Sequence, residues 1–337
     1  MAVSVAKKNA VAASSDASAN KKQYAQFFTL GAVAEFMSDM FDIQSNKAAA
    51  LLDPGAGEGM LGLTLSRRLT TQGFPAHTTF IEIDEQVFSK LSRFVGQQIE
   101  QTEAELLNGD FIKEGFRFLQ NGKRFSHVIM NPPYFKMRRN SRASDFLLSG
   151  GINVTNIYAA FMWLGLLLLE DDGQLVAIVP RSFCNGPYFL RFREFIAANV
   201  SIEAIHTFSS RDKVFSKDKV LQENVIIRFA KKRQSEQVKI SYSSDQRFED
   251  VEGASFSASE VLTTDASDLT IHIPQRGKNT QLDELVPCTL PDIGLEVSTG
   301  PIVDFRARDA ISERDCGGSI PLLYPAHMKD GHVVWPV

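Results

Sequence analysis

The stretch that decides the fold is residues 48–65, AAALLDPGAGEGMLGLTL. It opens on an apolar run, and apolar residues return from Met60 at roughly helical spacing, so the glycines between them lie at a turn from a strand to a helix. Gly55, Gly57 and Gly59 allow the backbone to pass close to a ligand, and the start of the helix offers free amide donors. Turns of this kind bind nucleotides in α/β sheets.

The glycine turn favours an uncharged nucleoside with an amino-acid tail over a phosphate group. Its spacing differs from the dinucleotide fingerprint Gly-x-Gly-x-x-Gly, and the Lys-Ser/Thr pair of a phosphate-binding loop is missing from this turn.

Acidic residues end the next two predicted strands. The apolar run 79–84 carries Glu82, which is 29 positions beyond Asp53 by subtraction, and an acidic residue at such a place takes ribose hydroxyls. The following short strand ends in Asp110 and Phe111. Asp110 could accept a hydrogen bond from an adenine amino group while Phe111 covers the ring.

The tetrapeptide Asn131-Pro-Pro-Tyr134 directly follows the apolar run 125–130. An amide or aromatic amine is a poor nucleophile because its lone pair is delocalised, so a catalyst must hold the NH2 group with acceptors. The Asn131 side-chain oxygen and the Pro132 carbonyl can both serve, and Tyr134 offers a flat face for stacking. Pro-Pro after a strand is also an ordinary way to end one. Its place after a nucleotide-type turn favours methyl transfer to an amino group.

The order of five motifs resembles that of gamma-class DNA adenine-N6 methyltransferases of type II restriction-modification systems. These motifs lie at 23–29, 53–59, 82–84, 109–111 and 131–134. The resemblance continues downstream and covers roughly residues 21–231. The segment 173–180 is similar to a later core strand of the family, and the segment 214–229 is similar to the family's segment that bears a second aromatic residue for the target base.

The resemblance implies S-adenosylmethionine as the cofactor and assigns roles residue by residue. The cofactor-binding residues would be Thr29, Asp53, Gly55, Ala56, Gly57 and Gly59 for its methionine part, Glu82 for its ribose, Asp110 and Phe111 for its adenine, with Asn131 alongside. Asn131 and Pro132 would bind the target amino group, and the flipped adenine would stack between Tyr134 and Phe215. Many members carry Glu where this sequence has Asp53, so the partner of this shorter side chain stays open.

The implied partner is double-stranded DNA, with a cognate restriction endonuclease as a possible second partner. The target base would be extruded from the duplex, and aromatic stacking would offset part of the cost. Direct in-line attack needs neither a metal ion nor a covalent enzyme intermediate.

The net charge of −4 opposes DNA binding, since phosphate contacts demand Lys and Arg. The distribution of charge matters more than the sum. A basic segment at 136–142 follows the catalytic turn, and Arg211, Lys213, Lys217 and Lys219 flank Phe215. Either segment is also explained as a solvated loop, but two of them around one pocket favour a polyanionic acceptor.

Composition fits a cytoplasmic enzyme, with 337 residues of which 44% are hydrophobic and 23% charged. The apolar run 162–169 is too short to span a membrane and predicts a buried helix. Cys184, Cys288 and Cys316 are odd in number and widely spaced, which indicates reduced thiols and neither a disulfide framework nor a metal site.

Short apolar runs that alternate with helical patterns predict a three-layer α/β fold with a mostly parallel sheet. The family resemblance implies that this is the Rossmann-like methyltransferase fold, with seven strands of which the final one is antiparallel. A flexible tail is expected at 1–20, the catalytic domain at 21–281, and the start of an incomplete target-recognition region at 282–337. Within these, 231–280 predicts a peripheral hairpin and linker, and short strands are expected within 293–303, 321–324 and 333–335.

Other functions stay open at this point. A protein-glutamine methyltransferase uses a similar Asn-Pro-Pro-Tyr turn on an amide, but the segment 23–29, the basic loops and Phe215 argue against it. An RNA adenine methyltransferase is the alternative most similar to a DNA adenine methyltransferase. A non-catalytic binding module is least favoured, because every proposed chemical group is retained.

Overall fold

The chain divides into two compact units, Met1–Arg276 and Gly277–Val337. The computed structural model describes residues 29–43, 48–98, 103–137, 142–208, 223–265, 268–274, 288, 290–296, 302–312, 317–318 and 320–334. The division falls a few residues before the boundary at 281/282 that the sequence predicts.

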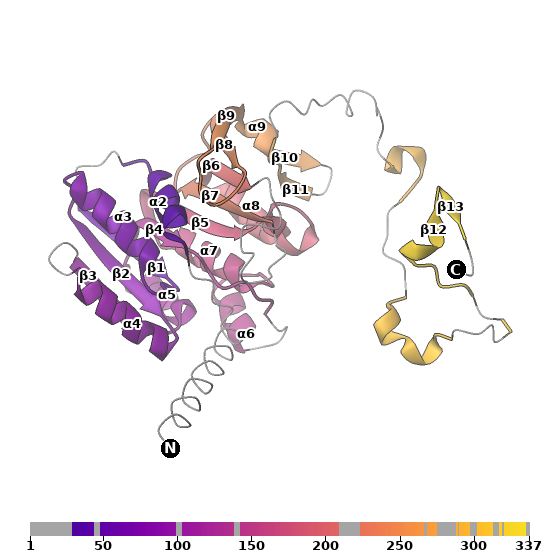
Figure 1. Cartoon of the computed structure of the whole chain (residues 1–337), viewed down its shortest axis with the longest axis horizontal. Coiled ribbons are helices and arrows are strands. Elements are labelled where there is room, and N and C mark those ends of the chain that lie inside the picture. Colours follow the sequence, from indigo (N-terminus) through magenta and orange to yellow (C-terminus); the bar gives the residue numbers. More distant parts are fainter. Residues whose placement is uncertain are drawn as a thin grey trace, which may run out of the picture. The chain divides into compact units, whose positions relative to one another are not determined.

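A nine-stranded sheet forms the centre of the first unit, in the order β3-β2-β1-β4-β5-β7-β6-β8-β9 (Figure 1). Its strands are β1 (Ala49–Pro54), β2 (Ala76–Glu82), β3 (Glu103–Asn108), β4 (Phe125–Met130), β5 (Leu169–Pro180), β6 (Ser201–Phe208), β7 (Asn224–Ala230), β8 (Gln237–Ser243) and β9 (Glu252–Ser257). Strands β1 to β5 are mutually parallel where they pair, whereas β7 runs antiparallel to both of its neighbours. The predicted α/β fold and the antiparallel late strand are confirmed.

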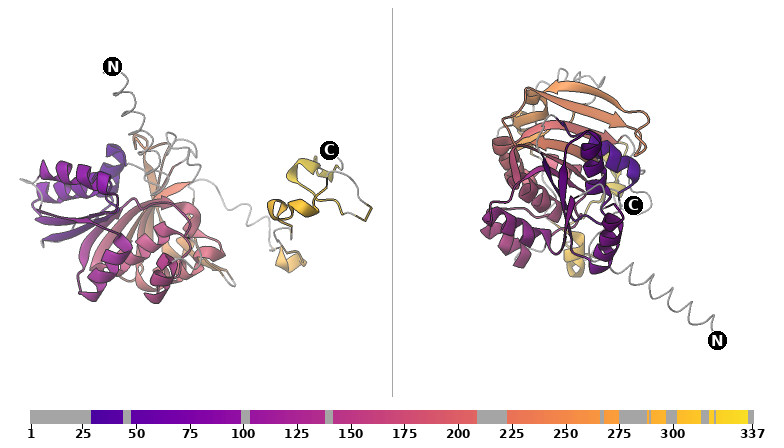
Figure 2. Two further views of the ribbon diagram at one scale, coloured as in Figure 1. Left: turned by 90° about the horizontal axis from the view of Figure 1, so that it is seen from below. Right: turned by 90° about the vertical axis from the view of Figure 1, so that its left-hand side faces the viewer.

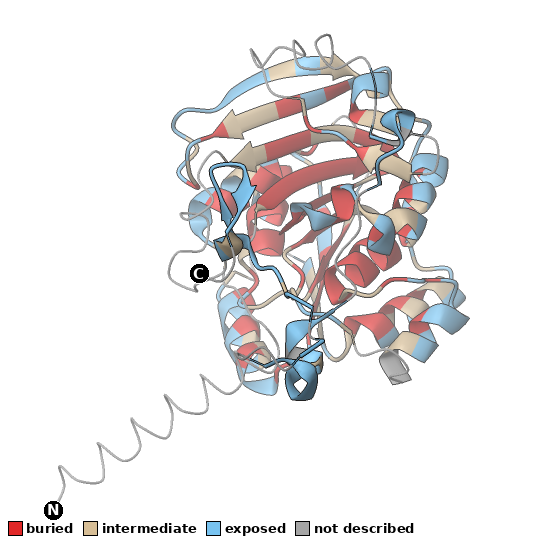
Figure 3. Ribbon diagram, turned by 90° about the vertical axis from the view of Figure 1, so that its right-hand side faces the viewer, coloured by how far each residue is buried: buried red, intermediate tan, exposed pale blue. Residues whose placement is uncertain are grey.

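Helices cover both faces of this sheet and make it three-layered (Figure 2). On one face lie α2 (Gly31–Asp39), α3 (Met60–Thr71) and α4 (Glu85–Gly96), and on the other α5 (Phe111–Gln120), α6 (Arg142–Ser149), α7 (Ile157–Leu167) and α8 (Leu190–Asn199). The inner strands are buried on both faces (Figure 3), which is why they appear in the sequence as nearly continuous apolar runs.

Helix α7 is the buried helix that the apolar run 162–169 predicts. Ten of its eleven residues are buried, from Ile157 to Leu166. Among the described residues, no helix is long and apolar enough to cross a membrane.

The hairpin predicted after residue 231 is present as the antiparallel pair β8–β9, but it belongs to the central sheet. Strand β8 pairs in parallel with β6, and β9 pairs with β8, so both extend the central sheet beyond the seven predicted strands. The strand that the sequence predicts at 238–242 coincides with β8, in which Val238 and Ile240 are buried while Gln237 and Lys239 are exposed. A small antiparallel hairpin of β10 (Leu262–Asp265) and β11 (Asp268–Ile271) follows the short helix α9 (Ala258–Val261).

The second unit has little regular structure in its described residues. It contains short 3-10 turns, such as Pro291–Ile293 and Asp304–Arg306, and one pair of two-residue strands, β12 (Met328–Lys329) and β13 (His332–Val333). Of the predicted strands only the last coincides with one, through Val333. The described part of 293–303 begins in a turn, and 321–324 pairs with no strand among the described residues. None of the described residues in this unit is buried, so no packed core dictates a strand pattern here.

Candidate active site

The glycine turn joins β1 to α3 at the carboxyl edge of the sheet. The backbone nitrogens of Gly55 and Ala56 donate to the Ile81 carbonyl at 2.8 and 2.9 Å, which fixes the turn against the end of β2. Gly59, with φ of 86°, caps α3 in the left-handed region, where a side chain would be strained. A Cβ at Gly57 would meet no atom within 4 Å, so open space adjoins the backbone at the middle of the turn.

Asp53 lies at the end of β1 beneath this turn and is only 1% exposed. Its Oδ2 accepts a hydrogen bond from the Gly62 nitrogen at 2.8 Å. Its Oδ1 is buried and has no hydrogen-bond partner among the described residues. Burial raises the pKa of Asp53 to about 7, the bond from Gly62 opposes this shift, and the nearby charge of Glu82 adds to it.

Glu82 ends β2 and holds the turn in place. Its two carboxylate oxygens accept from the backbone nitrogens of Gly57 at 2.9 Å and Asp84 at 2.8 Å. Burial raises the pKa of Glu82, although these backbone bonds favour the ionised form. A carboxylate can accept about four hydrogen bonds, so Glu82 keeps acceptor capacity for a further donor.

Asp110 and Phe111 follow β3 at the same edge. Asp110 caps helix α5, since its Oδ1 accepts from the Ile112 nitrogen at 2.9 Å. Phe111 is 2% exposed and packs in the core against Phe161, with ring centroids 4.8 Å apart. Phe161 in turn lies close beneath Gly55. The predicted contacts of Asp110 and Phe111 with an adenine ring remain predictions.

Asn131 follows β4, and its amide is held at both ends. The Nδ2 donates to the Thr29 hydroxyl at 3.2 Å, and the Oδ1 lies 2.8 Å from the Tyr134 hydroxyl. That hydroxyl is also 2.8 Å from the Ile178 carbonyl on β5. The orientation of the amide is therefore defined.

The Tyr134 side chain is half-buried, and Tyr158 stands edge-on to it with an interplanar angle of 88°. Burial raises the pKa of the Tyr134 phenol, with Tyr158 contributing, so the hydroxyl stays protonated and able to donate. Tyr158 is positioned by Ser182, whose hydroxyl is 2.9 Å from its own.

Several predicted residues lie outside the described residues. These are Phe215, the segment 23–28, and the basic residues Arg211, Lys213, Lys217 and Lys219. Of the basic segment 136–142, residues 138–141 also lie outside the described residues, and Lys136 is exposed just after the Asn131–Tyr134 turn.

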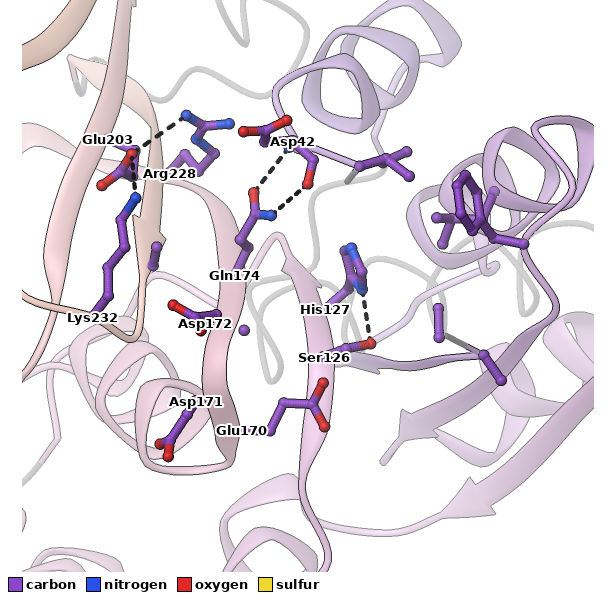
Figure 4. A pocket seen from close by; sticks show the side chains of 17 residues that line it. Asp42, Ser126, His127, Glu170, Asp171, Asp172, Gln174, Glu203, Arg228 and Lys232 are labelled. Carbon is purple, nitrogen blue, oxygen red and sulfur yellow. Dashed lines mark hydrogen bonds and ion pairs between the residues drawn. The ribbon is translucent and has the colours of Figure 1, made fainter. Parts of the chain in front are cut away.

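A cavity of about 490 Å³ opens at the opposite, amino edge of the sheet (Figure 4). It is bordered by the first residue of β1, Ala49, and by Ser126 and His127 at the start of β4. Across it, the Gln174 side chain exchanges two hydrogen bonds with the Asp42 backbone, at 2.9 and 2.6 Å. None of the described residues that line it is a predicted site residue, so this cavity and the predicted chemistry lie at opposite edges.

Comparison with known proteins gives the family of this chain. The family model of the Eco57I restriction-modification methylase matches residues 5–215. The chain belongs to this family. It is 35% identical over 330 residues to the Type II methyltransferase M.BsuBI of Bacillus subtilis and 34% identical over 333 residues to the Type II methyltransferase M.PstI of Providencia stuartii. These alignments cover 94% of the chain, which spans 66% and 65% of the two relatives.

Solved structures agree on the fold of this Eco57I-family chain. The methyltransferase subunit of a type I restriction-modification system from Streptococcus thermophilus superposes with a TM-score of 0.53 at 18% identity, covering 73% of this chain and 50% of that one. The type IIG restriction endonuclease BpuSI superposes with a TM-score of 0.53 at 17% identity, covering 69% and 31%.

The cofactor of this methyltransferase fold is S-adenosylmethionine, and the residues present fit it. The cofactor carries a cationic ammonium, and Asp53 provides a buried carboxylate oxygen that lacks a partner among the described residues. The open space beside Gly57 leaves room for a ligand against the turn. Within the described part of the chain, no group of three or more His, Cys, Asp or Glu side chains could hold a metal ion.

The sequence missed several residues that shape this site. Gly62 supplies the amide that Asp53 accepts, and a Cβ there would collide with the Phe80 ring. A glycine inside an otherwise apolar helical pattern was the available signal. Tyr158 and Phe161 looked like ordinary core residues of α7, and nothing in the sequence distinguishes them from their neighbours.

Proposed function

We propose that this chain transfers a methyl group from S-adenosylmethionine to the N6 amino group of adenine in a specific double-stranded DNA sequence. In this role it would protect host DNA from a cognate restriction endonuclease. The observation that carries the proposal is the Asn131 amide, held between Thr29 and Tyr134 on the same sheet edge as Asp53 and Glu82.

The chain's own residues would act by position. Asn131 Oδ1 and the Pro132 carbonyl would accept the two N–H groups of the amine and aim its lone pair, without a strong base. The face of Tyr134 would stack on the extruded base, and Phe215 would supply the second face. Asp53, Glu82 and the glycine turn would hold the cofactor, which when bound supplies an electrophilic methyl group.

The test is transfer of an isotopically labelled methyl group to mixed-sequence duplex DNA, followed by digestion to nucleosides and mass spectrometry. Label in N6-methyladenine is expected, and mapping the modified positions would then define the recognised site. Parallel reactions with RNA and with protein acceptors cover the other functions. Label confined to RNA, or to glutamine side chains, would overturn the DNA proposal.

Asn131→Ala provides the matched control for this experiment. Loss of transfer with retained cofactor binding is the expected result, since Asn131 would act on the target amine. Equal loss of both would show that Asn131 is structural.

A further inference from the structure

Asn224 is the first residue of β7 and lies at the carboxyl edge of the sheet. Its side-chain amide is buried but makes no hydrogen bond to the described residues. The residue is 3% exposed. Neither Oδ1 nor Nδ2 has a hydrogen-bond partner within the described part of the chain. Burying an amide without hydrogen bonds is costly, so a native fold that keeps one calls for an explanation, such as a ligand that completes the bonding.

The strand register places Asn224 next to the catalytic turn. Asn224 pairs with Pro180 at the end of β5, and Ile226 pairs with Ile178. Ile178 is the residue whose carbonyl lies 2.8 Å from the Tyr134 hydroxyl. Asn224 is therefore two residues further toward the same edge, on the strand beyond β5.

Asn131 and Asn224 lie on the same face of the sheet. Side chains alternate along a strand, so Asn224 shares its face with Ile226 and Arg228. Ile226 belongs to the core cluster that includes helix α2, and Arg228 Nη1 donates to the Met40 carbonyl just after that helix at 2.8 Å. The Asn131 amide meets Thr29, which lies just before α2.

The separation of the two amides suits a single planar group between them. One strand, β5, lies between β4 and β7. Neighbouring strands are about 4.8 Å apart, so β4 and β7 are roughly 10 Å apart across the sheet. The offset of two residues adds about 7 Å along the strands, so the backbones of the two asparagines are roughly 12 Å apart. The edge is also near the surface, because Glu223 beside Asn224 pairs at 3.2 Å with Arg181 and the two side chains are 36% and 44% exposed.

We propose that Asn224 is a further target-binding residue, whose Nδ2 donates a hydrogen bond to a ring nitrogen of the extruded adenine. This rests on the proposed function. Once the amino group is held by Asn131 and Pro132, adenine retains only acceptors, its ring nitrogens N1, N3 and N7. An amide donor is the group that matches them. Asn224 would thereby orient the ring while Asn131 aims the amine.

The first test separates this role from a structural one. Asn224→Leu keeps a similar volume and removes the amide, and replacing an unsatisfied buried polar group by an apolar one is neutral or stabilising. We expect the Tm to be equal to or above that of the unchanged protein, while kcat/KM for DNA falls about tenfold. Asn121→Leu is the control, because Asn121 is exposed at the end of α5 and should change neither. A lowered Tm with a matching loss of activity would overturn the proposal.

The second test identifies the contact on the base. Duplexes carrying the mapped site would contain 1-deaza-, 3-deaza- or 7-deazaadenine at the target position. The unchanged protein should lose about tenfold in kcat/KM on one of these analogues, and Asn224→Leu should lose nothing further on it. Equal losses for both proteins on all three would overturn the proposal. Methylation of the unmodified duplex by the unchanged protein is the internal control, since its absence would reject the proposed function instead.

Discussion

The carboxyl edge of the sheet is built from two kinds of polar group. On the side of β1, β2 and β3 the side chains are carboxylates, from Asp53, Glu82 and Asp110. On the side of β4 and β7 they are neutral amides, from Asn131 and Asn224.

This difference separates what each side can bind. A carboxylate suits a cationic ligand or a set of hydroxyl donors, whereas an amide suits a neutral group that offers both donors and acceptors. The carboxylates also accept backbone amides from the glycine turn, so that side is already organised by its own chain. The comparison predicts that cofactor binding and target binding can be impaired separately.

The largest expected effect is that of Asn131→Ala on methyl transfer. Loss of the acceptor that aims the amine should lower kcat by about 10²- to 10³-fold, the effect of removing one preorganised polar group from a reacting centre. The dissociation constant for S-adenosylmethionine, measured by calorimetry, should stay within about threefold, because the carboxylate side is untouched. A loss of cofactor affinity as large as the loss of kcat would break the division between the two sides.

Asp53→Asn should have the opposite profile. It keeps the shape and an acceptor for Gly62 but removes the charge, so cofactor affinity should fall about tenfold or more, the contribution of one charge-assisted hydrogen bond. At saturating cofactor, kcat should recover most of its value. If kcat fell while the dissociation constant did not change, Asp53 would belong to the reacting side.

Cofactor affinity should also depend on pH through Asp53, whose pKa burial raises to about 7. Below that value the free protein carries a neutral carboxyl, which attracts a cation weakly. Affinity for the cationic cofactor should therefore rise by up to about tenfold as the pH increases from about 6 to 8, and should level off above that. Calorimetry over this range checks it, and Asp53→Asn should give a flat profile.

Part of this architecture could be predicted from the sequence, because some elements are marked by the residues within them and directly beside them. Strand β4 ends where its apolar run ends, at Met130, and the glycines before α3 mark a turn whatever surrounds them. The family resemblance is also confirmed, and four of its five motifs, at 53–59, 82–84, 109–111 and 131–134, lie at the ends of β1, β2, β3 and β4.

The rest depends on contacts between distant segments. Strand β8 joins the sheet through β6, which precedes it by about 30 residues, and no local pattern reports that pairing. That Asn224 and Asp53 Oδ1 have no hydrogen-bond partner among the described residues is a property of the folded chain, which no local sequence pattern reports. In the second unit the alternating apolar residues predict strands. None of its described residues is buried, so no packed core stabilises an extended strand there.

The smallest expected effect is that of Tyr134→Phe, which tests the amide side alone. It keeps the ring face for stacking and removes only the hydroxyl that lies 2.8 Å from both Asn131 Oδ1 and the Ile178 carbonyl. A hydrogen bond of this kind contributes about 0.5–1.5 kcal/mol, so kcat should fall about three- to tenfold. Cofactor affinity should not change. Tyr134→Ala removes the ring as well and should raise KM for DNA beyond this. If Tyr134→Phe matched Tyr134→Ala, the hydroxyl and not the ring face would be what Tyr134 contributes, and stacking on the extruded base would be rejected.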